Sequence, residues 1–143
     1  MAALFFALSA TVANASPNPG DRILGVYKAV KDGAVSKVRV SKNEDNTYKA
    51  QVIWVEKEYN ADGSLRTDLK NPDPQKRNTP SSQIVLVESV SYDDGEWKNG
   101  KIYDPTKGDV YRVVITFKDE KTLRVRGYLG PFSKSVYWEK IGE

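Results

Sequence analysis

The sequence predicts an all-β protein whose strands form an antiparallel up-and-down meander that closes into a barrel of roughly eight strands. Apolar and polar residues alternate with a period of two through most of the chain. Short turn signals rich in Gly, Asn and Asp separate these alternating stretches, and no stretch has helical periodicity over three turns or more. Consecutive strands joined by hairpins form a meander, and closing it into a barrel removes the exposed edges. A flattened sandwich of the same strands is the alternative.

The expected strands follow one another at residues 23–29, 34–40, 47–56 and 83–92, then as a short segment around Trp97, and at 101–103, 110–118, 122–129 and 133–139. Asp32-Gly33 is a tight-turn signal between the first two strands. Asp93-Asp94-Gly95 ends the strand at 83–92, and Asn99-Gly100 is expected to turn the Trp97 segment back on itself. Gly130-Pro131 leads into the last strand.

Two strands show the alternation most clearly. The strand at 47–56 is predicted to place on one face Tyr48, Ala50, Val52 and Trp54. The strand at 110–118 is predicted to place on one face Tyr111, Val113, Ile115 and Phe117. Most of these aromatic side chains are expected to be core residues or cross-strand partners.

A chain of 143 residues is long enough for one domain with a single core. Residues 1–15 form a short apolar run that ends in Ala13-Asn14-Ala15, the pattern of a secretory signal peptide. The first charge is Asp21, so the basic start of such a signal is missing, and we expect it to be truncated. A core helix or an anchor is the alternative for this run. Residues 16–143 are then a single exported barrel domain without a transmembrane anchor.

The composition excludes several kinds of chemistry. The chain has no histidine and no cysteine, which removes a Ser-His-Asp triad, a cysteine nucleophile and the usual zinc sites. No nucleotide fingerprint or phosphate loop is present, so neither a cofactor nor a metal is expected. The 22 basic and 19 acidic residues are interspersed, which does not favour a nucleic-acid partner. Carboxylate, tyrosine, lysine and arginine chemistry remains.

Two Asp-Pro segments interrupt the strand pattern. The first lies in a long segment at 57–82 that has no strand pattern, and its three prolines predict an ordered cover rather than a linker. Asp73 before Pro74 suits the N-cap of one short helical turn. Asp104-Pro105 with Gly108 suits a hairpin connection in which the aspartate accepts from backbone donors and the glycine is left-handed.

A functional hypothesis applies to the same segments. Asp73, Arg77, Tyr103 and Asp104 would converge at one mouth of the barrel, where a pair of carboxylates could do acid-base work if burial raised one pKa. Single-sequence reasoning leaves the structural and the functional interpretation both open.

Several of these residues occur in an order that resembles a known family. The elements are Leu24-Gly25-Val26-Tyr27, the stretch 68–77 with Pro80, the stretch 100–105 with Gly108 and Tyr111, the stretch 123–130, and Tyr137-Trp138. This combination is similar to the bacterial domain of unknown function 2147 family. The resemblance implies a small exported protein, located in the periplasm or outside a Gram-negative bacterium, and no established activity. Gly25-Val26-Tyr27 also resembles the Gly-x-Trp opening of lipocalins, in keeping with a lipocalin- or streptavidin-like barrel.

The function that these observations favour is a non-enzymatic module that binds a small ligand or associates with the cell envelope. The alternatives are a structural or protein-interaction module of the envelope, with an envelope protein as partner, and a carboxylate-dependent enzyme acting on an envelope component. The oligomeric state is left open. The candidate ligand-binding residues are Arg77, Tyr103, Asp104, Asp73, Arg126 and Tyr128.

Overall fold

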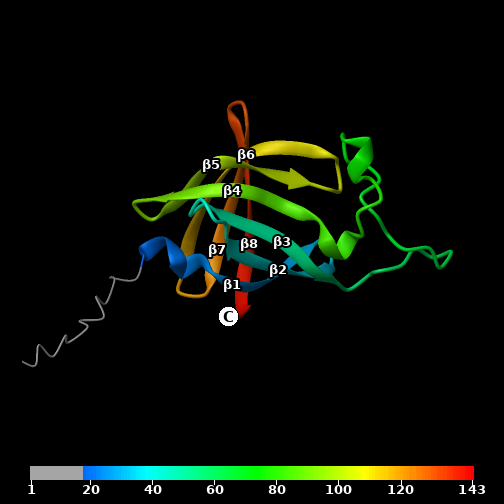
Figure 1. Ribbon diagram of the computed structural model, residues 1–143, viewed down its shortest axis with the longest axis horizontal. Helices are drawn as coiled ribbons and strands as arrows, with labels where there is room; N and C mark the ends of the chain where they lie inside the picture. The colour runs from blue at the N-terminus through cyan, green and yellow to red at the C-terminus, as the bar shows by residue number, and fades with distance from the viewer. Residues whose placement is uncertain (1–17) are drawn as a thin grey trace, which may run out of the picture.

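The computed structural model describes residues 18–143, which form a closed barrel of eight antiparallel strands (Figure 1). Each strand pairs with the next in the chain, and β8 pairs with β1. The strands are β1 (Gly25–Lys31), β2 (Ala34–Lys42), β3 (Tyr48–Val55), β4 (Val85–Asp93), β5 (Glu96–Asp104), β6 (Asp109–Asp119), β7 (Thr122–Leu129) and β8 (Phe132–Gly142). The predicted all-β meander is confirmed as a barrel rather than a sandwich. The signal peptide predicted at residues 1–15 lies outside the described residues.

Three short 3₁₀ helices accompany the strands: η1 (Pro19–Ile23), η2 (Pro74–Lys76) and η3 (Ser81–Gln83). η1 precedes β1, and the other two lie in the long segment between β3 and β4. Ile23, predicted to open the first strand, instead ends η1, because Asn18 caps this turn and Pro19 starts it. Among residues 18–143, no helix is long and apolar enough to cross a membrane.

The expected turn at Asn99-Gly100 is wrong, because both residues lie inside β5. Asn99 has a φ of 64°, and the register between β5 and β6 shifts between Trp97 and Gly100, as in a β-bulge. A Cβ on Gly100 would lie 2.0 Å from the Ser89 carbonyl oxygen, so β4 approaches too closely for a side chain. The dipeptide therefore bends one strand instead of connecting two.

The prediction that four alternate residues of β3 share one face is correct for the first three and wrong for Trp54. Tyr48, Ala50 and Val52 are buried, whereas Trp54 is 42% exposed. The register between β2 and β3 shifts between Lys37 and Val38, so that Trp54 pairs with Lys37 on the outer surface. There the Lys37 ammonium lies 4.8 Å from the centroid of the indole. The bulge reverses which side chains point inward beyond it.

Large aromatic side chains fill the interior of the barrel beneath η1. Tyr27, Tyr48, Trp97 and Trp138 are each at most 4% exposed and pack among buried Val, Ile and Leu side chains from the strands. The Tyr27 hydroxyl donates to the Ile23 carbonyl at 2.9 Å, and the Trp97 indole N–H donates to the Gly20 carbonyl at 3.1 Å. These two bonds hold η1 against one end of the barrel.

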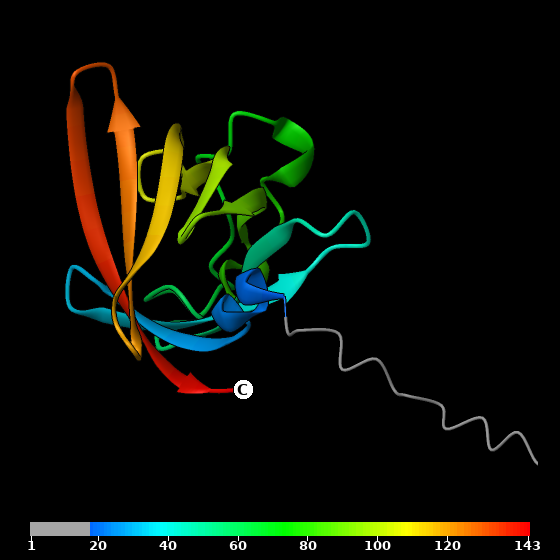
Figure 2. The ribbon, with the colours of Figure 1, turned by 90° about the vertical axis from the view of Figure 1, so that its left-hand side faces the viewer.

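The up-and-down order sorts the connections between two ends. The η1 end also carries the β2–β3, β4–β5 and β6–β7 turns and the C-terminus. The loop end carries the long segment between β3 and β4 together with the β1–β2, β5–β6 and β7–β8 connections, and Figure 1 shows η1 and the long segment on opposite sides of the barrel. Figures 1 and 2 both show the tip of the β7–β8 hairpin projecting beyond the other strands.

The barrel closes through a short seam between its first and last strands. β1 pairs with β8 only through residues 26–28 and 139–142. The rest of β8, residues 132–138, pairs with β7 alone.

Candidate functional site

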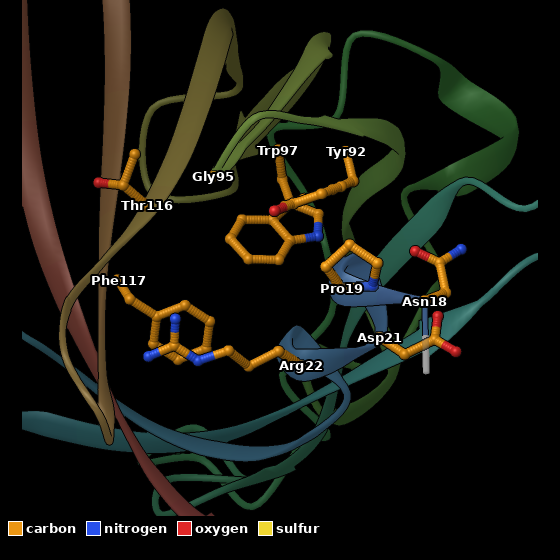
Figure 3. A pocket seen from close by; sticks show the side chains of 9 residues that line it. All are labelled: Asn18, Pro19, Asp21, Arg22, Tyr92, Gly95, Trp97, Thr116 and Phe117. Atoms are coloured by element: carbon orange, nitrogen blue, oxygen red, sulfur yellow. The ribbon is translucent and has the colours of Figure 1, made fainter. Parts of the chain in front are cut away.

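A cleft of about 700 Å³ opens at the η1 end of the barrel (Figure 3). η1 and the residue before it form one wall, and strands β4 to β6 form the other. The lining residues are Asn18, Pro19, Asp21, Arg22, Tyr92, Gly95, Trp97, Thr116 and Phe117. A volume of this size is in the usual range for small-molecule sites, roughly 300–1,000 Å³.

Three aromatic rings form the apolar part of the cleft. The Tyr92 and Trp97 ring centroids are 4.9 Å apart, and Trp97 meets Phe117 edge-to-face at 5.5 Å. Trp97 is held by its bond to Gly20 and by its place inside β5. Phe117 lies where β6 continues past its last pairing with β5, Trp97 with Ile115. The cleft is therefore open beside β6, and aromatic rings line it.

Arg22 supplies a positive charge to this aromatic surface. Its guanidinium carbon lies 4.0 Å from the Phe117 ring centroid, and Figure 3 shows the side chain reaching across the cleft to that ring. Among residues 18–143, Arg22 has no carboxylate within ion-pair distance and no side-chain hydrogen bond. Its five N–H donors are thus available to an acceptor from outside the protein.

The neighbouring carboxylate does not neutralise Arg22. Asp21 Oδ1 accepts a 2.6 Å hydrogen bond from the Tyr48 hydroxyl and lies 2.9 Å from the Lys42 ammonium. The Tyr48 bond and then Lys42 hold the pKa of Asp21 below its usual value, so it stays ionised. Burial, followed by the bond to Asp21, raises the pKa of Tyr48. Asp21 therefore pairs with Tyr48 and Lys42 and not with Arg22.

Four of the predicted site residues lie at the opposite, loop end. The Tyr103 hydroxyl donates to Asp68 Oδ1 at 2.7 Å, and the Asn71 amide donates to Asp68 Oδ2 at 2.8 Å. Arg77 Nε donates to the Asn71 carbonyl at 2.8 Å. Arg77 and Tyr103 are thus joined through Asn71 and the buried Asp68, neither of which was singled out from the sequence.

Asp104 and Asp73 have local structural partners. Asp104 Oδ1 lies 2.6 Å from the Lys31 ammonium and accepts from Thr106 N–H at 2.9 Å. Partial burial opposes ionisation of Asp104, but Lys31 and the Thr106 N–H outweigh it and lower its pKa. Asp73 accepts from the Gln75 N–H at 3.0 Å and caps η2, as predicted. The structure places both aspartates in the capping and turn roles expected from the sequence.

The long segment packs on the β5–β6 turn. Gly108 has a φ of 71°, as predicted, and a Cβ there would lie 2.2 Å from the Lys70 carbonyl oxygen. The Lys70 ammonium also donates to the Thr106 carbonyl at 2.9 Å. These contacts fix the position of the segment at the loop end.

Arg126 and Tyr128, the remaining two candidates, lie on the outer surface of β7, away from the other four. Arg126 pairs across the sheet with Ser135, and Tyr128 pairs with Ser133. Their neighbours Val125 and Leu123 are buried, so the alternation directs Arg126 outward.

Sequence reasoning missed the residues of the η1-end cleft. Arg22 was not singled out from the sequence, and Tyr92 and Phe117 were treated as ordinary strand residues. The one available signal was Asn18 before Pro19, a cap followed by a helix-starting proline, which marks an ordered turn ahead of the first strand.

Comparisons with known proteins agree with the fold. The model of a family described as "Uncharacterized protein conserved in bacteria (DUF2147)" matches residues 25–140. No curated protein gives a significant match. Among solved structures, the chain is similar to protein HP1028 from Helicobacter pylori, which is described as belonging to the lipocalin family. The two are 21% identical over 82% of each chain, with a TM-score of 0.66, a likeness that shows the fold.

Proposed function

The chain belongs to the DUF2147 family of uncharacterized bacterial proteins and folds as a lipocalin-like barrel, and we propose that it binds a small amphiphilic anion at the η1 end. The observation that carries this proposal is the Arg22 guanidinium over Phe117, without a carboxylate partner among the described residues and inside an aromatic-lined cleft. A ligand with a flat apolar body and one carboxylate or sulfonate fits both parts of that surface.

The filled core supports a site at the end of the barrel rather than in its centre. Eight-stranded barrels either fill their interior with side chains or hold one small ligand. Here the buried Tyr27, Tyr48, Trp97 and Trp138 occupy the interior beneath η1, between the cleft and the rest of the barrel. We therefore propose η1, rather than the long loop, as the element that covers the ligand.

The proposed role is binding without chemistry, in an exported protein. The sequence has no histidine or cysteine to act as base or nucleophile. Asp104 is tied to Lys31 and a turn N–H, and Asp73 caps η2, so neither supports acid-base work by a carboxylate pair. The apolar run that ends at Ala15 supports export.

The test uses an aromatic sulfonate, 8-anilinonaphthalene-1-sulfonate, as a fluorescent probe. We expect saturable binding, and a shift of the Trp97 indole N–H resonance, because this ring lines the cleft. Arg22→Gln removes the charge-assisted bond and should weaken binding about tenfold or more. Arg39→Gln is the matched control, since Arg39 lies on the exposed surface of β2 and outside the cleft. Equal affinity of the Arg22→Gln variant and the unmodified protein would remove the basis of the proposal.

A further inference from the structure

A second surface, separate from the cleft, combines an exposed apolar tip with a cationic sheet face. We propose that the β7–β8 hairpin and the outer face of β5 to β8 dock this protein on an anionic phospholipid surface.

The apolar tip is the end of the projecting hairpin. Leu129 and Phe132 pair directly across the turn and are 64% and 75% exposed. Nothing lies within 4 Å of a Cβ built on Gly130 in the turn between them, so the tip has open space around it. Figures 1 and 2 show it beyond the neighbouring strands. Two large apolar side chains at a projecting tip can enter a bilayer without any change of the barrel.

The cationic face lies behind the tip on the same sheet. The cross-strand register aligns three outward rows, which are Lys101–Arg112–Tyr128–Ser133, Val114–Arg126–Ser135 and Thr116–Arg124–Tyr137. These rows contain four cations and no carboxylate. The sheet face behind the tip is therefore positively charged.

The arginines are held in place by neutral groups. Arg112 and Arg126 lie 4.1 and 5.0 Å from the Tyr128 ring centroid. Arg126 donates from Nε and Nη2 to the Ser133 hydroxyl, and Arg124 Nε donates to Ser135. Within residues 18–143 none of the three forms an ion pair. They are oriented but not neutralised, which suits them to an external phosphate.

One pair of like charges on this face would also be stabilised by an external anion. Lys101 lies directly opposite Arg112 on the sheet. Like charges at such positions destabilise a sheet, and an anion bound between them removes the repulsion.

The spacing matches the depth of a lipid headgroup layer. At roughly 3.4 Å per strand residue, Arg126 lies about 10 Å behind Leu129, and Arg124 about 17 Å behind it. The headgroup region on each side of a bilayer is roughly 5–8 Å thick, and long arginine side chains reach along it. With Leu129 and Phe132 in the hydrocarbon, Arg112 and Arg126 meet the phosphates, whereas Arg124 lies beyond them.

The apolar tip distinguishes a bilayer from a soluble phosphate as partner. A polyphosphate chain would accept hydrogen bonds from the arginines, but it has no apolar part in which Leu129 and Phe132 could be buried. A membrane surface accepts both, because apolar insertion and attraction to anionic lipids add.

The test is sedimentation with vesicles of phosphatidylglycerol and phosphatidylcholine in equal parts, and with pure phosphatidylcholine vesicles. We expect binding to the anionic vesicles that weakens in high salt. The double variant Leu129→Ser/Phe132→Ser and the double variant Arg112→Gln/Arg126→Gln should each lose about tenfold or more in affinity. Arg124→Gln should lose clearly less than either. Residues 1–15 are the same in every protein compared, so the differences report the hairpin and its sheet face.

The matched control is Arg39→Gln/Lys49→Gln, which removes two positive charges from the outer surface of β2 and β3. Its affinity should stay within about twofold of the unmodified protein, because these charges lie away from the hairpin. Phe132→Trp supplies a direct readout of insertion: brominated lipids should quench its added fluorescence. Equal loss in the control and the Arg112/Arg126 variant, absence of quenching, or binding of polyphosphate but not of vesicles would each overturn the proposal.

Discussion

The Tyr103 hydroxyl donates a 2.7 Å hydrogen bond to Asp68, which joins β5 to the long loop thirty-five positions earlier in the chain. Asp68 is 4% exposed, and its other oxygen accepts from Asn71. A buried carboxylate needs such donors, since burial without them costs several kcal/mol. The pair is therefore a structural anchor that keeps the long loop on the barrel.

Tyr103→Phe should lower the free energy of unfolding by about 1–3 kcal/mol, because Asp68 then lacks one donor while remaining buried. Urea unfolding measures this change. Tyr59→Phe is the control, since Tyr59 is 60% exposed and should leave the midpoint unchanged. An unchanged midpoint for Tyr103→Phe would mean that Asp68 finds another donor.

Asp104→Asn should lower stability at neutral pH by about 0.5–2 kcal/mol, through a weakened cap on the turn and the lost ion pair with Lys31. The folded-state pKa of Asp104 lies below its unfolded value, so its contribution is present above about pH 4 and is lost as pH falls further. The difference in melting temperature between variant and unmodified protein should therefore shrink in acid. A difference that is constant with pH would contradict this assignment of charge.

Alkaline pH should destabilise the barrel. Burial is the main cause that raises the pKa of Tyr27, Tyr48 and Tyr103, and bonds to carboxylates add to it for the last two. A raised folded-state pKa gives stability that is complete below the unfolded value, about 10, and is lost above it. We expect the phenolate absorbance of these tyrosines to appear together with loss of the far-ultraviolet strand signal. If all three tyrosines ionised at a lower pH than the one at which the barrel unfolds, the link between their ionisation and unfolding would be disproved.

Gly108→Ala should destabilise the protein by more than Gly63→Ala. Both glycines have positive φ, 71° and 86°, so both substitutions carry a backbone penalty of about 1 kcal/mol. Only at Gly108 would the new methyl group collide with the Lys70 carbonyl, whereas Gly63 faces open space. The difference between the two melting temperatures isolates the contact between the long loop and the β5–β6 turn. Equal effects would show that the loop moves aside freely.

Local patterns were sufficient to predict the strands, most of the turns and the caps. Asp73 and Asp104 behave as their neighbouring residues predict, because a cap or a turn is decided within three residues. Closure into a barrel was the preferred of two arrangements, and the flattened sandwich stayed open because a run of hairpins does not decide whether the first and last strands pair.

The cleft depends on distant residues and was not predictable. Arg22 and Phe117 meet only because η1 folds against the end of the barrel. The direction of Trp54 was predicted wrongly because one bulge between β2 and β3 reverses the alternation. Asn99-Gly100 forms a bulge because the backbone of β4 passes close to it, and that closeness is a property of the folded sheet.

The short seam between β1 and β8 has a consequence for how the chain folds. Seven of the eight strand pairings join sequence neighbours. Six of them close short turns at a small loop-closure cost, and the β3–β4 pairing closes the long segment between these strands. The seam joins the two ends of the domain through few residue pairs. Bringing these distant strands together costs much chain entropy, and the few contacts formed return little stabilisation. We expect it to form last and to limit the folding rate. The species before it is a curled sheet with both outer edges open, and this is the state in which the chain is most prone to aggregate.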